Sequence, residues 1–203
     1  MKLYGSINSP FVRMTMMTSI ECGLGDDVEL ISTSVELTKV QPALEALSPV
    51  AKIPVLETDD GQAVYDSRVI MEYLCIRAGN TTMLPQTPAP RIRVLTLLAM
   101  AQGFGDTAVG LRYETFARPQ PRQWPDLITR QELRIAAVMA ELDAKWMADL
   151  ANVTLGSIAV AAVLGYVDFR QLAPQWHIKL PRLADRYKQF SQRESMVRTA
   201  PKG

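Results

Sequence analysis

The sequence predicts an α/β domain at the amino end followed by an all-helical domain. Strand-like and helix-like segments alternate over the first eighty of its 203 residues. Three prolines at positions 85, 88 and 90 then stand among polar residues, a composition typical of a linker. Beyond them, apolar residues recur at the spacing of three and four that helices require. We therefore expect an α/β domain at 1–79, a linker at 80–90 and a helical domain at 91–203.

The elements of the first domain follow from local signals. Between the first two predicted strands, Val12, Met16 and Ile20 lie four residues apart and Gly23 stands where a helix would end. Asp60 and Gly61 form a hairpin signal. The predicted strands are 2–6, 28–33, 53–57 and 63–65, and the predicted helices are 10–22, 42–47 and 66–78. The order βαβ, short helix, ββα is a thioredoxin-like arrangement.

The second half has helical periodicity throughout. One long helix is predicted from residues that step by threes and fours along one face, namely Ile128, Gln131, Ile135, Val138, Leu142 and Trp146. Further helices are predicted at 91–116, 155–172 and 182–190.

Charge and hydropathy point to a small-molecule partner. Lysine and arginine number 22 and acidic residues 21, a net charge of +1. This balance lacks the positive surface that binds nucleic acid or anionic lipid. The most apolar stretch, residues 158–167, is shorter than the roughly 20 residues that span a membrane, and the first residues lack the apolar core of a signal peptide. We expect a cytoplasmic protein without a nucleic-acid or membrane partner.

Cysteine and histidine give no sign of metal chemistry. Cys22 and Cys75 are the only cysteines, and their spacing does not resemble a metal site. We expect two reduced thiols packed as small apolar side chains. His177, the only histidine, lacks companions for a metal site or a catalytic triad. No metal is expected.

Ser9 and Pro10 lie where the first predicted strand passes into the first helix. Serine is a favoured N-cap and proline suits the first helical turn, so the pair can be purely structural. The same position suits an anion, because a helix N-terminus offers free N–H groups and a positive dipole. A hydroxyl there can donate a hydrogen bond to a bound thiolate. The residues alone leave both interpretations open.

Pro54 stands at the start of the third predicted strand. An ordinary trans proline suits that position, and only about 5–6% of such bonds are cis. A cis bond would instead turn the backbone of Ile53 toward a cleft, where its N–H and C=O can pair with a peptide ligand as an added strand does. Periodicity does not decide between them.

Asp66 and Ser67 open the third predicted helix. Asp66 as an N-cap is an adequate structural account. Alternatively, the Ser67 N–H binds a carboxylate while Asp66 receives an ammonium group, the two charges of an amino-acid end. Both interpretations can hold together.

These segments together resemble the glutathione S-transferase family. The matching runs are Ser-Pro-Phe-Val-Arg at 9–13, Ser-Pro-Val-Ala-Lys-Ile-Pro-Val-Leu at 48–56 and Tyr-Asp-Ser-Arg-Val-Ile-Met-Glu-Tyr-Leu at 65–74. Thr-Leu-Gly-Ser-Ile-Ala at 154–159 resembles the helix-capping motif of the family. Gly-Tyr-Val-Asp-Phe-Arg at 165–170 and Phe-Ser-Gln-Arg-Glu-Ser at 190–195 are similar to its bacterial, YibF-like branch. The resemblance covers essentially the whole chain.

The resemblance implies a role for each matching residue. Ser9 would contact the glutathione sulfur. Pro54 would be the cis-proline of the family, with Ile53 pairing to the cysteinyl backbone of glutathione. Asp66 and Ser67 would hold the γ-glutamyl end, and Lys52 would approach the ligand near them. The family is usually homodimeric.

A second-substrate pocket is implied at Phe11, Arg112, Tyr113 and Phe116, with Arg118 nearby. A partly exposed helix face is the commoner explanation for any one of the residues on the helical domain.

Two departures from the family pattern bear on stability. Ala51 replaces the usual glycine, which we expect to cost little in a loop. Ser157 replaces an acid in the capping motif, so we expect a weaker reciprocal bond to Thr154. The expected loss of stability is about 1 kcal/mol.

The resemblance implies an enzyme that binds glutathione and conjugates it to a small electrophile or uses it to reduce a peroxide. Serine at position 9 donates a hydrogen bond and forms no covalent intermediate, and Asn8 beside it can add a polar contact. Cysteine there would instead favour thiol exchange. The alternative is a non-catalytic module that holds glutathione or a protein partner on the same fold.

Overall fold

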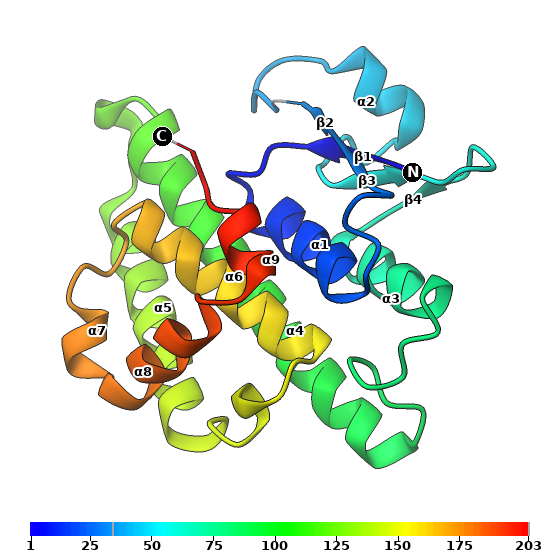
Figure 1. The fold of residues 1–203 in the computed structure, drawn as a ribbon. Coiled ribbons are helices and arrows are strands. Elements are labelled where there is room, and N and C mark those ends of the chain that lie inside the picture. The colour runs from blue at the N-terminus through cyan, green and yellow to red at the C-terminus, as the bar shows by residue number, and fades with distance from the viewer. Residues whose placement is uncertain (34, 203) are drawn as a thin grey trace.

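Four short strands form the sheet of the amino-terminal domain. The computed structural model, which describes residues 1–33 and 35–202, orders them β2-β1-β3-β4. Parallel β1 and β2 are joined by a helix, whereas β3 is antiparallel to β1 and β4. With the helices this is the predicted thioredoxin-like arrangement (Figure 1). The bounds are β1 Lys2–Gly5, α1 Pro10–Glu21, β2 Glu29–Ser32, α2 Pro42–Leu47, β3 Val55–Glu57, β4 Ala63–Val64 and α3 Ser67–Arg77.

The predicted turns and helix ends are present. Gly23 and Gly79 follow α1 and α3 with φ of 73° and 62°, a left-handed conformation that glycine adopts without strain. In the β3–β4 hairpin the Gly61 N–H donates to the Thr58 carbonyl at 3.0 Å. The glycines after α1 and α3 and the turn at Gly61 explain why α1, α3 and β3 end close to where the sequence predicts.

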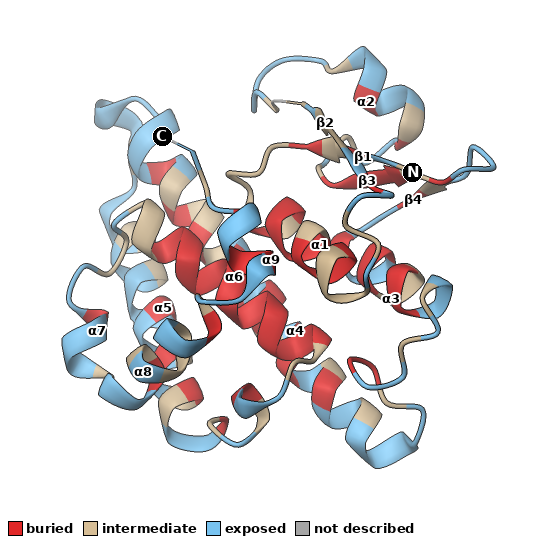
Figure 2. Ribbon diagram, in the orientation of Figure 1, coloured by how far each residue is buried: buried red, intermediate tan, exposed pale blue. Residues whose placement is uncertain are grey.

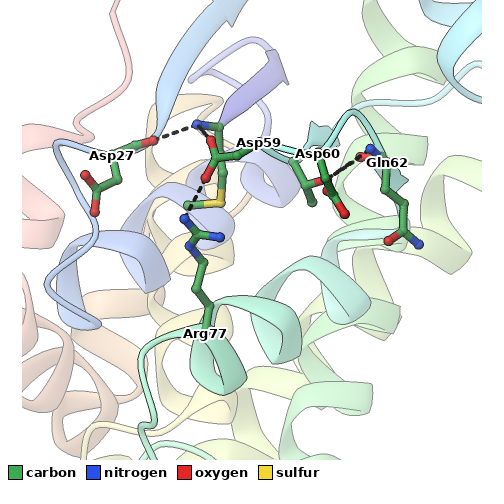
Figure 3. Close-up of polar contacts among 7 residues, drawn as sticks. Asp27, Asp59, Asp60, Gln62 and Arg77 are labelled. Carbon is green, nitrogen blue, oxygen red and sulfur yellow. Dashed lines mark hydrogen bonds and ion pairs between the residues drawn. The ribbon is translucent and has the colours of Figure 1, made fainter.

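The amino terminus is fastened to the sheet (Figure 3). The Met1 ammonium donates to the Asp27 carbonyl at 3.0 Å and to the Asp59 carboxylate at 2.8 Å. Arg77, at the end of α3, donates to the same carboxylate at 2.6 Å. The hydrogen bond from the ammonium is the main cause that lowers the pKa of Asp59. This cluster secures the end of the sheet where β1 begins.

The described elements beyond α3 are helical. α4 begins at Pro88, inside residues 80–90, because proline at positions 88 and 90 fits a first helical turn. α4 ends at Arg112, short of the predicted residue 116, and a π-helical turn follows. α6 ends at Phe169, short of the predicted residue 172. The bounds are α4 Pro88–Arg112, η1 Tyr113–Ala117, η2 Gln120–Arg122, α5 Pro125–Lys145, η3 Asp149–Ala151, α6 Leu155–Phe169, α7 Trp176–Lys179, α8 Pro181–Phe190 and α9 Glu194–Arg198.

Helix α1 lies between two cores. Val12 packs with strand residues Leu3 and Leu56. Met14 and Met17 are also fully buried, but they belong to the larger core, which the helical domain mostly forms. Buried residues lie along α1 and along the neighbouring α4 and α6 (Figure 2). Of the three residues whose spacing predicted this helix, Val12 is fully buried, whereas Met16 and Ile20 are half-buried. The physical reason is that the helical domain covers the face of α1 that turns away from the sheet.

The start of α6 corrects an expectation about capping. The Thr154 hydroxyl accepts from the Ser157 N–H at 3.2 Å, and the Ser157 hydroxyl accepts from the Thr154 N–H at 2.9 Å. The expected weakening of the reciprocal bond was wrong, because the serine lies close enough to make it. The Ser157 hydroxyl also donates to the Asn152 carbonyl at 2.7 Å.

The helix formed by Pro88–Ala117 is long and apolar enough to span a membrane by length and composition. In this fold it is a core helix, since Leu97, Ala101, Phe104 and Ala108 are buried against the rest of the helical domain.

Candidate functional site

The register of the sheet brings three connections to one edge. Tyr4 pairs with Val55, and Leu56 pairs with Val64. Because paired strands advance in step, the end of β1, the start of β3 and the end of β4 meet at the same edge. Helices α1 and α3 both begin there, at Pro10 and Ser67. The predicted residues on these three connections therefore gather around two helix N-termini.

Ser9 occupies the N-cap position of α1 but does not act as a side-chain cap. Its backbone has the extended conformation of an N-cap, and its hydroxyl makes no hydrogen bond to the helix. The residue is half-buried. The first N–H groups of a helix lack partners within the helix. The hydroxyl and these N–H groups are together suited to an anion at this point.

Ile53 offers backbone groups at the same edge. The Ile53–Pro54 peptide bond is cis, as the resemblance implies. Ile53 precedes β3, and the backbone hydrogen bonds that the described loops and turns make do not use it. Its N–H and C=O are thus available to an extended ligand. Lys52 beside it is exposed.

Asp66 caps α3, as the structural interpretation predicts. Its carboxylate accepts from the Arg68 N–H at 3.0 Å and from the Arg68 guanidinium at 3.2 and 2.8 Å. The hydrogen bond from the Arg68 side chain is the main cause that lowers the pKa of Asp66. The carboxylate therefore stays ionised near neutral pH and can also accept from an ammonium group.

Ser67 is connected to the helical domain by a residue that the sequence did not single out. Gln102 of α4 donates to the Ser67 hydroxyl at 2.9 Å and contacts the Met14 sulfur at 3.3 Å. Both Ser67 and Gln102 are buried. The hydroxyl thus positions the start of α3, and the Ser67 N–H remains the group for a ligand. The only sequence signal for Gln102 was an amide at a buried position of a helix.

Asn8 is bound to the carboxy-terminal segment. Its side-chain amide donates to the Lys202 carbonyl at 2.9 Å and accepts from the Lys202 N–H at 2.9 Å. The last described residues therefore lie beside the connection that carries Ser9. A polar contact from Asn8 to a ligand would compete with these two bonds.

The implied second-substrate residues occupy two neighbouring places. Phe11 packs between α4 and α6. A Cβ atom added to Gly105 of α4 would lie 3.0 Å from the Phe11 ring and 3.3 Å from the side chain of Val163 on α6. Arg112, Tyr113 and Phe116 lie at the end of α4, with the Arg112 guanidinium 3.4 Å from the centroid of the Phe116 ring. Arg118 is paired with Glu114 at 2.7 Å.

The cysteines and the histidine have structural partners. Cys22 and Cys75 are reduced, and the hydrogen bond between their thiols is the main cause that raises the pKa of Cys75. The His177 Nε2 lies 2.9 Å from Asp168, which also accepts from Trp176 at 2.6 Å. Within residues 1–33 and 35–202, no three His, Cys, Asp or Glu side chains gather in a way that could hold a metal ion.

Comparison with known proteins decides the family. The family model described as "Glutathione S-transferase, N-terminal domain" matches residues 8–76. The GST-like protein YibF of Escherichia coli (strain K12) is 34% identical over 207 residues, covering 99% of this chain and 98% of that protein. The chain belongs to the glutathione S-transferase family.

Solved structures of other glutathione S-transferase family members agree over the full length. A member from Pseudomonas fluorescens Pf-5 with bound glutathione has a TM-score of 0.95 and 36% identity, covering 100% of this chain and 99% of that one. The match from Pseudomonas fluorescens Pf-5 with bound S-(propanoic acid)-glutathione has a TM-score of 0.91 and 35% identity, with full coverage of both chains. A glutathione S-transferase from Methylobacillus flagellatus KT with glutathione bound has a TM-score of 0.85 and 31% identity, covering 99% of each chain.

Proposed function

We propose that this glutathione S-transferase family member binds glutathione at the sheet edge, stabilises its thiolate and transfers the sulfur to a small electrophile. The observation that carries the proposal is the Ser9 hydroxyl, which stands at a helix N-terminus and caps nothing. The glutathione held by the relatives from Pseudomonas fluorescens and Methylobacillus flagellatus supports the choice of ligand. The S-(propanoic acid)-glutathione held by another match supports a site that accepts substituents on the sulfur.

Each contact of the proposed complex uses a group that this fold presents. The Ile53 N–H and C=O pair with the cysteinyl backbone, as an added strand would. The Ser67 N–H binds the γ-glutamyl carboxylate, Asp66 accepts from the ammonium group, and Lys52 lies near the ligand. These contacts fix the position of the thiol, so the reaction with a second substrate becomes effectively intramolecular.

The proposed chemistry needs an ionised thiol. The Ser9 hydroxyl donates a hydrogen bond to the thiolate, and the dipole of α1 favours the negative charge. The sulfur gives an electron pair to the electrophilic carbon, a sulfur–carbon bond forms, and the bond to the leaving group breaks with its electron pair. With a peroxide the sulfur attacks the terminal oxygen instead, the O–O bond breaks and an alcohol leaves, so that glutathione becomes a sulfenic acid. A second glutathione thiol then displaces water from this sulfur, which leaves glutathione oxidised to its disulfide and the peroxide reduced to the alcohol and water. No bond to the protein forms.

Calorimetric titration of glutathione into wild type and Ser9→Ala at several pH values tests this proposal. We expect wild type to bind glutathione and to lower the pKa of the bound thiol, seen as thiolate absorbance near neutral pH. Ser9→Ala should lose about 1.5–3 kcal/mol of thiolate stabilisation, roughly a tenfold or greater fall in turnover. Ser191→Ala is the matched control, because its hydroxyl donates only to the Lys188 carbonyl, within α8.

The outcomes separate the proposal from its alternative. Tight glutathione binding without thiolate in wild type would favour a non-catalytic module on this fold. An absence of glutathione binding would overturn the proposal itself.

We further propose a homodimer formed through the outer face of α3 and α4 and located in the cytoplasm. Val69, Ile76 and Ile92 are exposed there, at 52%, 71% and 62%. A hollow of about 220 Å³ lies between the helices, and its lining includes apolar Val69, Leu95 and Ala99 together with charged Arg68 and Glu72. An apolar face with a hollow is suited to a self-complementary contact.

A further inference from the structure

Two arginines lie side by side where α4 and α6 end. A Cβ on Gly156 would meet Leu97 at 2.9 Å, and a Cβ on Gly105 would meet Val163 at 3.3 Å. The two helices therefore run parallel, with position 105 beside 163. Arg112 and Arg170 each follow seven residues later, two helical turns or about 10.5 Å further along both axes. The register places Arg112 and Arg170 at the same level of α4 and α6, which run alongside each other (Figure 1).

The electrostatic surroundings agree with this placement. Burial is the main cause that lowers the pKa of Arg112, and the positive charge of Arg170 lowers it further. Tyr166, one turn before Arg170 on α6, is buried at 6% exposure, and its ring centroid lies 5.7 Å from the Arg170 guanidinium carbon. Two like charges held together are unfavourable unless an anion lies between them.

The described residues supply no counter-charge. Neither arginine takes part in the ion pairs formed among residues 1–33 and 35–202. The two acids on adjacent turns are engaged elsewhere: Glu114 with Arg118 and the Trp124 N–H, and Asp168 with Trp176 and His177. The Arg170 Nε is buried without a hydrogen-bond partner. A buried guanidinium N–H without an acceptor is costly, so an acceptor is missing here.

Aromatic rings surround the pair. Arg112 lies over the Phe116 ring at 3.4 Å, and Arg170 lies 4.2 Å from the centroid of the Phe169 ring. Phe116 and Tyr113 are 70% and 39% exposed. These rings hold the guanidinium planes and offer an apolar wall to a ligand with an aromatic body.

The pair lies on the same two helices, α4 and α6, that pack against Phe11. Phe11, two residues after Ser9, packs beside Gly105 of α4 and close to Val163 of α6. Arg112 and Arg170 lie two helical turns further toward the C-terminal ends of these helices. The backbone of Lys202 is bonded to Asn8, the residue directly before Ser9.

We propose that Arg112 and Arg170 form a carboxylate site that selects electrophiles with an acidic group on an aromatic body. This inference rests on the proposed glutathione function, since the electrophile must meet the sulfur held near Ser9. The carboxylate accepts hydrogen bonds from both guanidinium groups, which present the planar donors that carboxylates match. The aromatic body lies along Phe116 and Tyr113, and the reactive carbon points back toward Ser9.

A binding experiment tests this selectivity without turnover. The probes are S-(4-carboxybenzyl)glutathione and S-benzylglutathione, which differ only in the carboxylate, with glutathione itself as the third ligand. Each is titrated calorimetrically into wild type, Arg112→Gln, the double variant Arg112→Gln/Arg170→Gln, and Arg122→Gln as a surface control. We expect wild type to bind the carboxybenzyl derivative about tenfold or more tightly than the benzyl derivative, the ratio that one charge-assisted hydrogen bond supplies.

The double variant should lose this ratio, Arg112→Gln should reduce it, and Arg122→Gln should keep it. Equal affinity of wild type for the two derivatives, or a ratio that survives in the double variant, would overturn the carboxylate site while leaving glutathione binding intact. Failure of wild type to bind glutathione would overturn both proposals. A thermal melt shows whether each variant is folded. If the double variant fails to fold, the affinity ratio of Arg112→Gln is compared with that of wild type instead.

Discussion

Ala51 has a backbone conformation that its side chain opposes. Its φ is 50°, in the left-handed region where a Cβ crowds the following carbonyl and costs about 1–2 kcal/mol. The expectation that alanine costs little at this position, where the family usually has glycine, was wrong for this reason. The strain lies directly before Lys52 and Ile53, the segment proposed to meet glutathione. Strained positions of this kind are found at functional sites.

Replacing Ala51 by glycine should stabilise the protein. Relief of about 1–2 kcal/mol outweighs the loss of about 0.4–1 kcal/mol that a more flexible unfolded chain causes. The net gain of roughly 0.5–1 kcal/mol should raise the Tm by about 1–3 °C in a chain of this size, measured by thermal melting. Ala78→Gly is the control, because Ala78 has φ of −83° and glycine there should destabilise. A lower Tm for Ala51→Gly would contradict the argument.

Single residues differ in how far the sequence revealed them. Ser9, Pro54 and Asp66 stand in short motifs, so local patterns with the family resemblance were enough to identify them. Gln102 and Ser67 meet across 35 positions, and Arg112 meets Arg170 only because two helices run parallel. Periodicity within one segment carries no information about such contacts. The sequence therefore singled out candidates for the proposed glutathione contacts more fully than candidates for the proposed electrophile contacts.

The end of α1 is joined to the start of α9 by a carboxylate. Glu21 accepts from Arg193 at 2.8 and 2.8 Å and from the Ser195 hydroxyl at 2.5 Å. Burial raises the pKa of Glu21, but the hydrogen bonds from Arg193 and Ser195 outweigh it, so the pKa lies below its ordinary value. The link ties the α/β domain to the last helix of the chain. α9 was not among the predicted helices, because five residues are too few for a periodic pattern.

This link should make stability depend on acid pH. A carboxyl whose pKa is lowered by folding stabilises the protein above its ordinary value of about 4.3 and loses that contribution as the pH falls through the folded pKa. Glu21→Gln should cost about 1–2 kcal/mol at pH 7, and the difference in Tm from wild type should shrink below about pH 4.5. The control is Glu194→Gln, whose exposed pair with Arg198 should contribute little. A Tm difference that stays constant down to pH 3 would exclude this role for Glu21.

Helix α1 packs against both domains and so joins them. Its residue Arg13 is buried at 4% exposure and donates to the Met196 carbonyl at 3.2 Å. Gly165 of α6 leaves room for this side chain, since a Cβ there would meet the guanidinium at 2.2 Å. The sequence predicted both domains but not this joint, because an arginine in a helix pattern is ordinarily exposed. The two domains are therefore packed against each other through α1, at whose N-terminus the proposed glutathione site lies.

The outer face of α3 and α4 is the surface on which assembly can be tested. If the proposed homodimer forms there, a charge on Val69 should separate the subunits, because an unpaired buried carboxylate is strongly unfavourable at an apolar contact. Sedimentation velocity should give wild type at twice the chain mass and Val69→Asp at the chain mass over micromolar concentrations. Val197→Asp is the matched control, because Val197 is an exposed valine on a different helix. Its exposure is 65% on α9, and that of Val69 is 52% on α3. Wild type that sediments as a monomer would overturn the homodimer. A Val69→Asp variant that remains dimeric while Val197→Asp dissociates would place the contact on another face. Because Arg68 and Val69 follow Ser67 directly, loss of the dimer should also weaken glutathione binding, which titration of the same variants measures.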